Sequence, residues 1–464
     1  MKRILYTLLT AAPVLFGNYF FANGTLEATI ETPTPIPSPT LVSLPGTFVP
    51  TPVGGPTQPP TPAEVRDPYG EVYFSVIAPD MSSQIAPEIP IDKFITRLVR
   101  LPGSCVVGLI ECPALEEVQT PFNMGDALVL GGDTKNMEWS PDGRYAALVI
   151  HPQDDFTKGW TAEEWEQIKQ KKIEDYKVSP STLYLFDAQT DTWRELYHAD
   201  RKFFYSVRWS PDGQWIAFTV ASSLFTFHPM QNDDGAYIVH PDGSGLRNLG
   251  GRGNFIQGWI GNSLLLWRPI DPASGSFAHV MEMLSMEGET KPMFESSRIV
   301  SYSPAPDGGT LLAADGQSAS APTSSKAVEL LALDGSVIRS FGTFINHTSM
   351  VYPLAWSRDG SMVAFANLRR VYVAPREGPG LTNGMVGIPP ETREVYAADD
   401  STSQPQFFGF EFSSDNKYLV MQFWDGMTRF AAVALDNGQV IALDIPELDP
   451  YASDQQVSYF SWRP

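Results

Sequence analysis

The sequence predicts an all-β protein with the architecture of a β-propeller, and three observations support this prediction. A motif of an aromatic residue followed by Ser-Pro-Asp-Gly recurs along the chain. Short apolar runs separated by turn residues follow each copy, which is typical of small antiparallel sheets. The last copy is incomplete at the C-terminus, and strands that complete it are predicted near the N-terminus.

The repeat is clearest in three places: WSPDG at residues 139–143, WSPDG at 209–213 and WSRDG at 356–360. Looser copies begin at Trp259, Tyr302 and Phe412, and a half-copy begins at Phe460. Propeller repeats usually span about 40–50 residues, so the longer intervals between these copies indicate insertions. Seven blades are therefore predicted, with six blades as the alternative if the copy at Trp259 or Tyr302 merges with a neighbour.

Each copy has the chemistry of a β-hairpin. A strand ends at the aromatic residue, and Pro-Asp-Gly then makes a tight turn, because Pro fixes φ, Asp bonds to the backbone and Gly accepts a positive φ. An apolar second strand follows, as at residues 216–218. Third and fourth strands are predicted downstream, for example at residues 183–187 and 246–249. Four short antiparallel strands are one propeller blade.

The seventh blade is predicted to contain both ends of the chain. Its first strand is the C-terminal half-copy. Residues 67–74 resemble the turn and second strand, residues 94–101 the third strand and residues 115–120 the fourth. Such closure removes the exposed edges of the first and last sheets.

The W-S-P-D-G pattern, followed by an apolar strand, resembles the repeats of TolB-type propellers, also called PD40 or WD40-like repeats. The resemblance extends from about residue 69 to residue 464 and is most specific at the three clear copies. It implies a periplasmic or surface propeller that binds other proteins. The repeats are also similar to the propeller half of prolyl-oligopeptidase-like enzymes. TolB has an additional N-terminal α/β domain, where this chain has a Pro-rich segment.

The region before the repeats is predicted to contain two segments. Residues 1–24 have a basic start at Lys2 and Arg3 and then an apolar run, which is the pattern of a signal peptide. An uncleaved N-terminal anchor is the alternative, and the only membrane attachment predicted. Residues 25–66 are rich in Pro and Thr and are predicted to form a disordered stalk, so the propeller takes residues 67–464.

Composition narrows the class of partner and the compartment. The net charge of −21 argues against nucleic acid, because phosphate binding needs a basic surface. Cys105 and Cys112 are the only cysteines, and in an exported chain they predict a disulfide. The expected location is therefore extracytoplasmic: secreted, periplasmic or at the cell surface. The expected partner is an envelope or extracellular protein.

Function is predicted to lie in insertions on one face of the ring. These insertions, near residues 151–181, 221–235, 268–277 and 316–326, fall mostly between the second and third strands of their blades. Loops on a rigid scaffold are the usual place for binding. The largest insertion contains a predicted helix with a capping box at residues 161–164. The candidate binding residues are His151, Trp160, Trp165, Phe227, His228, Asp233 and Asp234.

The chain carries no recognisable catalytic, cofactor or metal motif, and none of these sites is predicted. The nucleophile elbow G-x-S-x-G, the zinc motif H-E-x-x-H and the P-loop are not found in the sequence. The favoured hypothesis is a protein-binding or scaffold module of the cell envelope. The alternative is a propeller enzyme, a hydrolase or lyase acting on glycan or peptide at the mouth of the channel.

Overall fold

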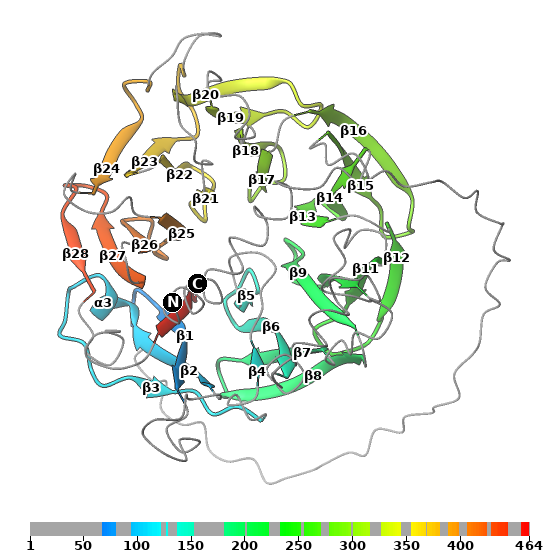
Figure 1. Ribbon diagram of the computed structural model, residues 1–464, viewed down its shortest axis with the longest axis horizontal. Helices are drawn as coiled ribbons and strands as arrows, with labels where there is room; N and C mark the ends of the chain where they lie inside the picture. The colour runs from blue at the N-terminus through cyan, green and yellow to red at the C-terminus, as the bar shows by residue number, and fades with distance from the viewer. Residues whose placement is uncertain are drawn as a thin grey trace, which may run out of the picture.

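Seven antiparallel sheets stand in a ring around a central axis, as the computed structural model shows (Figure 1). The structure describes residues 67–79, 94–121, 127–128, 137–152, 181–199, 202–221, 233–251, 255–270, 278–297, 300–315, 326–344, 354–367, 369–380, 388–398, 406–424, 428–443 and 456–463. The seven-bladed prediction is confirmed, and the six-bladed alternative is wrong, because the copies at Trp259 and Tyr302 belong to separate sheets.

Three blades follow one another from the first clear repeat. Blade 1 contains β4 (Ala127–Leu128), β5 (Met137–Trp139), β6 (Tyr145–Pro152), β7 (Ser181–Asp187) and β8 (Thr192–Ala199). Blade 2 contains β9 (Phe203–Trp209), β10 (Ile216–Ala221), β11 (Asp233–Val239) and β12 (Arg247–Gly250). Blade 3 contains β13 (Phe255–Ile260), β14 (Ser263–Pro269), β15 (His279–Leu284) and β16 (Thr290–Ser296).

Three more blades continue the ring with the same inner-to-outer order. Blade 4 contains β17 (Val300–Pro304), β18 (Leu311–Asp315), β19 (Lys326–Leu331) and β20 (Val337–Phe344). Blade 5 contains β21 (Leu354–Trp356), β22 (Met362–Asn367), β23 (Arg370–Pro375) and β24 (Arg393–Ala397). Blade 6 contains β25 (Gln406–Phe412), β26 (Tyr418–Trp424), β27 (Thr428–Ala434) and β28 (Val440–Ala442).

The closing blade joins the two ends of the chain, as the sequence predicted. Its strand order is β29, β1, β2, β3. These strands are β29 (Gln456–Trp462), β1 (Glu71–Pro79), β2 (Phe94–Pro102) and β3 (Glu116–Glu117). Val72 of β1 pairs with Trp462 of β29. Figure 1 shows the red C-terminal strand beside the blue β1.

Strand pairing corrects the phase of two repeat copies. Trp209 pairs with Ile216, the first residue of the second strand, and Trp356 pairs with Val363 near the same point of its blade. The matching positions in blade 4 and the closing blade are Pro304 and Trp462, not Tyr302 and Phe460. Both predicted starts are two residues early, because a strand's period of two makes such a shift keep the same face.

The turns form as the motif predicts. In blade 2 the Gly213 N–H donates to the Ser210 carbonyl at 2.9 Å, and Gly213 has a φ of +68°. The Ser210 hydroxyl donates to Asp212 at 2.6 Å, and the same carboxylate accepts the N–H of Gln214 at 3.0 Å. The Trp215 N–H returns to the Ser210 hydroxyl at 2.9 Å. These hydrogen bonds close the turn within residues 210–215.

The core lies between neighbouring blades. One cluster packs Leu183, Leu185 and the partly buried Tyr197 of blade 1 against Phe204 and Phe218 of blade 2. The indole N–H groups of Trp209, Trp259 and Trp356 link blades as well: Trp209 donates to the Glu138 carbonyl at 2.7 Å. Trp259 and Trp356 make the same kind of bond, to the carbonyls of Arg208 and Ser303. The motif Trp residues are therefore structural.

Two features outside the strands complete the fold. A short helix, α3 (Gly103–Val106), follows β2, and the predicted disulfide joins Cys105 and Cys112. Sequence patterning missed α3, because four residues give no helical period. The predicted helical insertion lies outside the described residues. Among the described helices, none is long and apolar enough to cross a bilayer.

Candidate functional site

The two faces of the ring are built from different connections. In each antiparallel blade the first and third connections lie on one face, here called the turn face. The second and fourth connections lie on the opposite face, here called the insertion face. The four segments predicted to be insertions are second connections in the chain order, and the described strand ends that flank them lie on the insertion face.

The structure places only part of the predicted binding set. His151 lies in β6 and Asp233 in β11, each at the end of its strand nearest the insertion face. Asp234 follows in the same strand and is partly buried. The remaining candidates, Trp160, Trp165, Phe227 and His228, lie outside the described residues.

Asp234 forms an ion pair that sequence reasoning missed. Its carboxylate meets the Lys202 ammonium at 2.5 Å, and its backbone carbonyl accepts a hydrogen bond from the Asn248 amide at 2.9 Å. In blade 1, the Thr182 hydroxyl lies 2.8 Å from Nδ1 of His198. These contacts fix the strand ends from which segments 153–180 and 222–232 leave the sheets.

In blade 3, similar contacts lie near the strand ends that flank residues 271–277. The Arg268 guanidinium contacts the buried Glu282 carboxylate at 2.5 Å. His279 is fully buried; its Nε2 lies 2.9 Å from the Tyr302 hydroxyl and its ring stacks on Trp267. No spacing in the sequence predicts these pairs, because the two partners of each pair come from neighbouring strands or blades. These contacts hold the strand ends at the insertion face in place.

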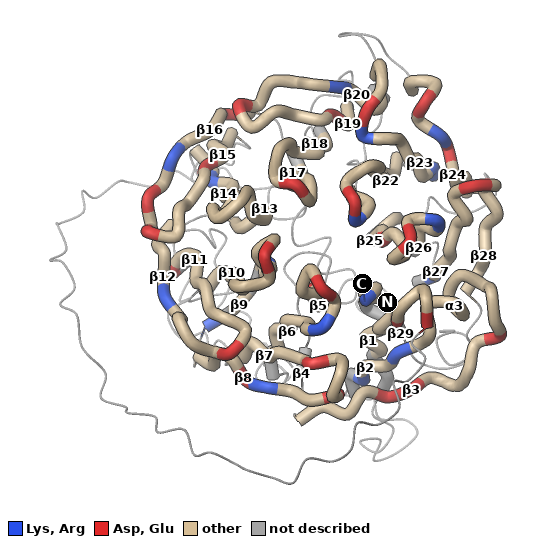
Figure 2. Tube along the Cα trace, turned by 180° about the vertical axis from the view of Figure 1, so that it is seen from behind, with Lys and Arg blue, Asp and Glu red and all other residues tan. Residues whose placement is uncertain are grey.

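The turn face has a different character, because its charged groups are engaged within the fold. The Ser210 hydroxyl holds the pKa of Asp212 below its ordinary value, and Arg376 does the same for the pKa of Asp307. Figure 2, drawn from behind relative to Figure 1, shows acidic and basic positions together at the inner ends of several blades.

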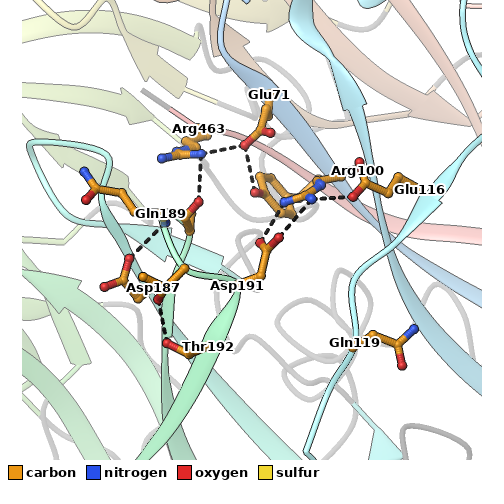
Figure 3. Close-up of polar contacts among 12 residues, drawn as sticks. Glu71, Arg100, Glu116, Gln119, Asp187, Gln189, Asp191, Thr192 and Arg463 are labelled. Carbon is orange, nitrogen blue, oxygen red and sulfur yellow. Dashed lines mark hydrogen bonds and ion pairs between the residues drawn. The ribbon is translucent and has the colours of Figure 1, made fainter. Parts of the chain in front are cut away.

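A charged seam joins the closing blade to blade 1 on this face (Figure 3). Arg463 donates to the Glu71 carboxylate at 2.6 Å and to the Gly143 carbonyl at 2.9 Å. The Tyr73 hydroxyl donates to the same oxygen of Glu71 at 2.9 Å. Burial, and then the Glu71 charge, raise the pKa of Tyr73 well above its usual range, so the phenol stays neutral.

The seam continues outward through a second arginine. Arg100 donates to both carboxylate oxygens of Asp191, at 2.8 and 3.0 Å, and also contacts Glu116 (Figure 3). The hydrogen bond from Arg100 lowers the pKa of Glu116, and the Glu116 partner in turn raises the pKa of Arg100. Fixed opposite charges of this kind join the closing blade to blade 1.

Two longer third connections also lie on the turn face, which the sequence prediction did not identify. One contains α3 and the disulfide, between β2 and β3. The other runs from Pro375 to Arg393 in blade 5, where the nearly buried Arg339 of blade 4 contacts Glu391 at 2.7 Å. Both segments pack onto a neighbouring blade and are part of the scaffold.

Within the ranges that the structure describes, no group of three or more His, Cys, Asp or Glu side chains is arranged to hold a metal ion. The insertion face, whose strand ends are held by the Lys202–Asp234 and Arg268–Glu282 pairs, is the candidate site that the sequence analysis predicted.

Comparison with known proteins places the chain among propeller structures. No protein-family profile matches the sequence, and no curated protein matches it. The structure is similar to TolB from Acinetobacter baumannii, at 14% identity, with a TM-score of 0.40, over 86% of this chain and 67% of that one.

Two enzymes that contain similar folds are also found. An acylaminoacyl peptidase from Pyrococcus horikoshii is 12% identical, with a TM-score of 0.48, over 81% of this chain and 51% of that one. This chain therefore spans about half of the peptidase. An oligogalacturonate lyase from Vibrio parahaemolyticus is 13% identical, with a TM-score of 0.36, over 75% of each chain. Identities this low describe fold alone.

Proposed function

We propose that this propeller is an extracytoplasmic protein-binding or scaffold module of the cell envelope that holds its partner on the insertion face. The observation that carries the proposal is the distribution of second connections around the ring. In blades 1 to 4 these connections contain residues 153–180, 222–232, 271–277 and 316–325. In blades 5 and 6 the second connections are much shorter, because β23 begins at Arg370 just after Asn367, and β27 at Thr428 just after Trp424.

The uneven distribution matters because it makes one side of the face distinct. The closing blade adds residues 80–93 next to blade 1. In five consecutive blades the second connection is therefore long in sequence, and the Lys202–Asp234 and Arg268–Glu282 pairs hold strand ends that flank two of these connections. A rigid base with long connections on one side is the usual arrangement of a binding surface.

The extracytoplasmic location is supported by the disulfide between Cys105 and Cys112. Disulfides persist in oxidising compartments and are rare in the cytosol. The N-terminal basic and apolar run is consistent with export. A protease-accessibility assay on intact cells that carry a C-terminally tagged chain tests this part: a tag that is degraded only after lysis of every membrane contradicts export.

Binding is tested by cross-linking in intact cells, followed by affinity capture and mass spectrometry. The wild-type chain is compared with a variant that lacks residues 156–178 of the largest insertion. A matched control replaces residues 381–387 on the turn face with a Gly/Ser segment of equal length. One envelope protein is expected to be enriched by the wild type and the control and lost with the deletion.

The proposal is abandoned if the control and the deletion lose the same proteins, or if no protein is enriched. In the second case, turnover of glycans or peptides by the purified propeller decides for the enzyme alternative.

A further inference from the structure

The N-terminal segment leads into the propeller through a strand that has a neighbouring strand on each side. Residues 1–66 precede Asp67, and the first strand after it, β1, lies between β29 and β2. The strand pairs with β2 along its whole length, from Glu71 to Pro79, and with β29 from Val72 to Ile77. Tension on the preceding segment therefore acts on a strand that is hydrogen-bonded on both sides.

The turn before β1 is held by α3. The Asp67 carboxylate accepts hydrogen bonds from the N–H of Ser104, at 3.2 Å, and from its hydroxyl. The Gly103 N–H donates to the Gly70 carbonyl at 2.8 Å. A Cβ atom at Gly103 would lie 2.4 Å from the Tyr69 carbonyl oxygen, so only glycine permits this approach. The helix and the turn are thus in direct backbone contact.

The C-terminal strand holds the same turn from the other side. The Trp462 indole donates to the Tyr69 carbonyl at 2.6 Å, and the Arg463 N–H donates to the Glu71 carbonyl at 2.8 Å. The Cys105–Cys112 disulfide closes the segment after α3, and the buried Cys105 belongs to the core cluster that contains Trp462. Two elements distant in sequence, α3 with its disulfide and β29, therefore close around residues 67–71.

We propose that this arrangement is a mechanical anchor, which lets the propeller stay folded while tension passes from its N-terminal segment to a partner on the insertion face. Asp67 lies on the turn face, and β1 runs from there toward the insertion face. Such tension acts along β1, so the bonds to β2 and β29 share the load and must break together. The direction of load rests on the proposed function, whereas the resistance of the anchor does not.

The same blade provides an internal comparison. Trp462 at the end of β29 pairs with Val72 at the start of β1, so both chain ends leave the blade at the turn face. Tension between the two chain ends therefore pulls β29 sideways from β1, and the hydrogen bonds break one pair at a time. The anchor predicts strong resistance in the first direction and weak resistance in the second.

Single-molecule force spectroscopy on the full chain tests this difference. One handle is attached at the N-terminus, and the other either at the C-terminus or at an Ile270→Cys substitution. Ile270 is 45% exposed and follows β14 on the insertion face. Both native cysteines are in the disulfide, so the new thiol is the single free one. We expect the first rupture force to be at least twofold higher with the handle at position 270. Equal or lower force there overturns the proposal.

The role of α3 is tested in the same apparatus with C105S/C112S. This variant is expected to lower the rupture force in the geometry with the handle at position 270, and to change it little between the two chain ends. Ser104→Ala, which removes only the hydroxyl to Asp67, is a milder second variant and should give a smaller fall in the same geometry. Ser285→Ala, in a turn of blade 3, is the control and should change neither force. An unchanged force in both anchor variants shows that α3 does not hold the turn. None of these measurements needs a partner, so their outcome is independent of the binding proposal.

Discussion

Blade 2 and the closing blade form the equivalent turn differently: in blade 2 the chain is continuous through the turn, whereas in the closing blade the turn is made from both chain ends. In blade 2, Ser210 gives its N–H to the Trp215 carbonyl, and its own carbonyl accepts the Gly213 N–H. In the closing blade the corresponding N–H comes from Arg463, which donates to Glu71. The corresponding carbonyl comes from Asp67, which accepts the Gly70 N–H.

In the closing blade, two residues, Arg463 and Asp67, therefore take the role that Ser210 alone has in blade 2. As a result, different residues form the hydrogen bonds to the polar groups of the turn. In blade 2 the Ser210 hydroxyl and the Asp212 carboxylate bond to each other. In the closing blade Tyr69 takes the place of Asp212, and Asp67 is bonded by Ser104 from another connection. A local motif can be replaced by distant contacts, but the fold then depends on each of them.

The largest expected effect is from Arg463→Ala. This side chain is 8% exposed and bonds to the Glu71 carboxylate and to carbonyls of blade 1, at Gly143 and Ala188. Its loss leaves a partly buried carboxylate unpaired, so we expect a fall of about 3 kcal/mol in the free energy of unfolding. Urea unfolding monitored by tryptophan fluorescence measures it. Arg144→Ala removes the nearby but exposed pair with Asp187 and should have a much smaller effect. Equal effects of the two substitutions contradict the importance of the divided turn.

Opening the disulfide should have the next largest effect. The bridge between Cys105 and Cys112 closes a short segment, for which chain entropy gives a stabilisation of roughly 2.5 kcal/mol. C105S/C112S should therefore lower the urea midpoint with no change in the far-UV circular dichroism spectrum. Reducing agent should lower the midpoint of the wild type to the same extent and leave the variant unchanged. A midpoint that reduction does not move argues against the contribution of this loop.

A smaller difference is expected between two tryptophans of the repeat. The Trp209 indole N–H bonds to the Glu138 carbonyl at 2.7 Å. The buried indole N–H of Trp139 has no partner in the part of the chain that the structure describes; the Arg463 guanidinium lies 5.9 Å from the centre of its ring. Trp209→Phe should cost about 1 kcal/mol more than Trp139→Phe, because only the first breaks a hydrogen bond. Thermal unfolding of both variants gives the comparison, and the reverse order contradicts it.

The smallest effect concerns acid stability. The Ser210 hydroxyl lowers the pKa of Asp212 in the folded chain below the unfolded value of about 3.9. The resulting stabilisation is complete above the unfolded pKa and is lost as the pH falls through the lower folded pKa. Asp212→Asn should therefore flatten the pH dependence of unfolding below about pH 4. A wild type and variant with parallel profiles from pH 2 to pH 6 exclude this contribution.

The sequence by itself determined the repeat, the ring closure and the disulfide, whereas the structure decided between seven blades and six. These features follow from local chemistry: Pro-Asp-Gly makes a turn wherever it occurs, strand periodicity exposes one face to the core, and two cysteines allow one pairing. The phase of the copies at Tyr302 and Phe460 was wrong by two residues, since a period-two pattern repeats after that shift.

Only the tertiary structure decided which side chains meet across blades. Such contacts join residues that are far apart in sequence or in different connections. They include the Lys202–Asp234 pair, the seam of Arg463, Glu71 and Arg100, and the hydrogen bonds from Ser104 to Asp67. No spacing encodes such contacts, because they depend on the rotation of one sheet against the next. The same limit applies to function: the repeat defines a scaffold, whereas its partner is selected by surfaces that the ring assembles.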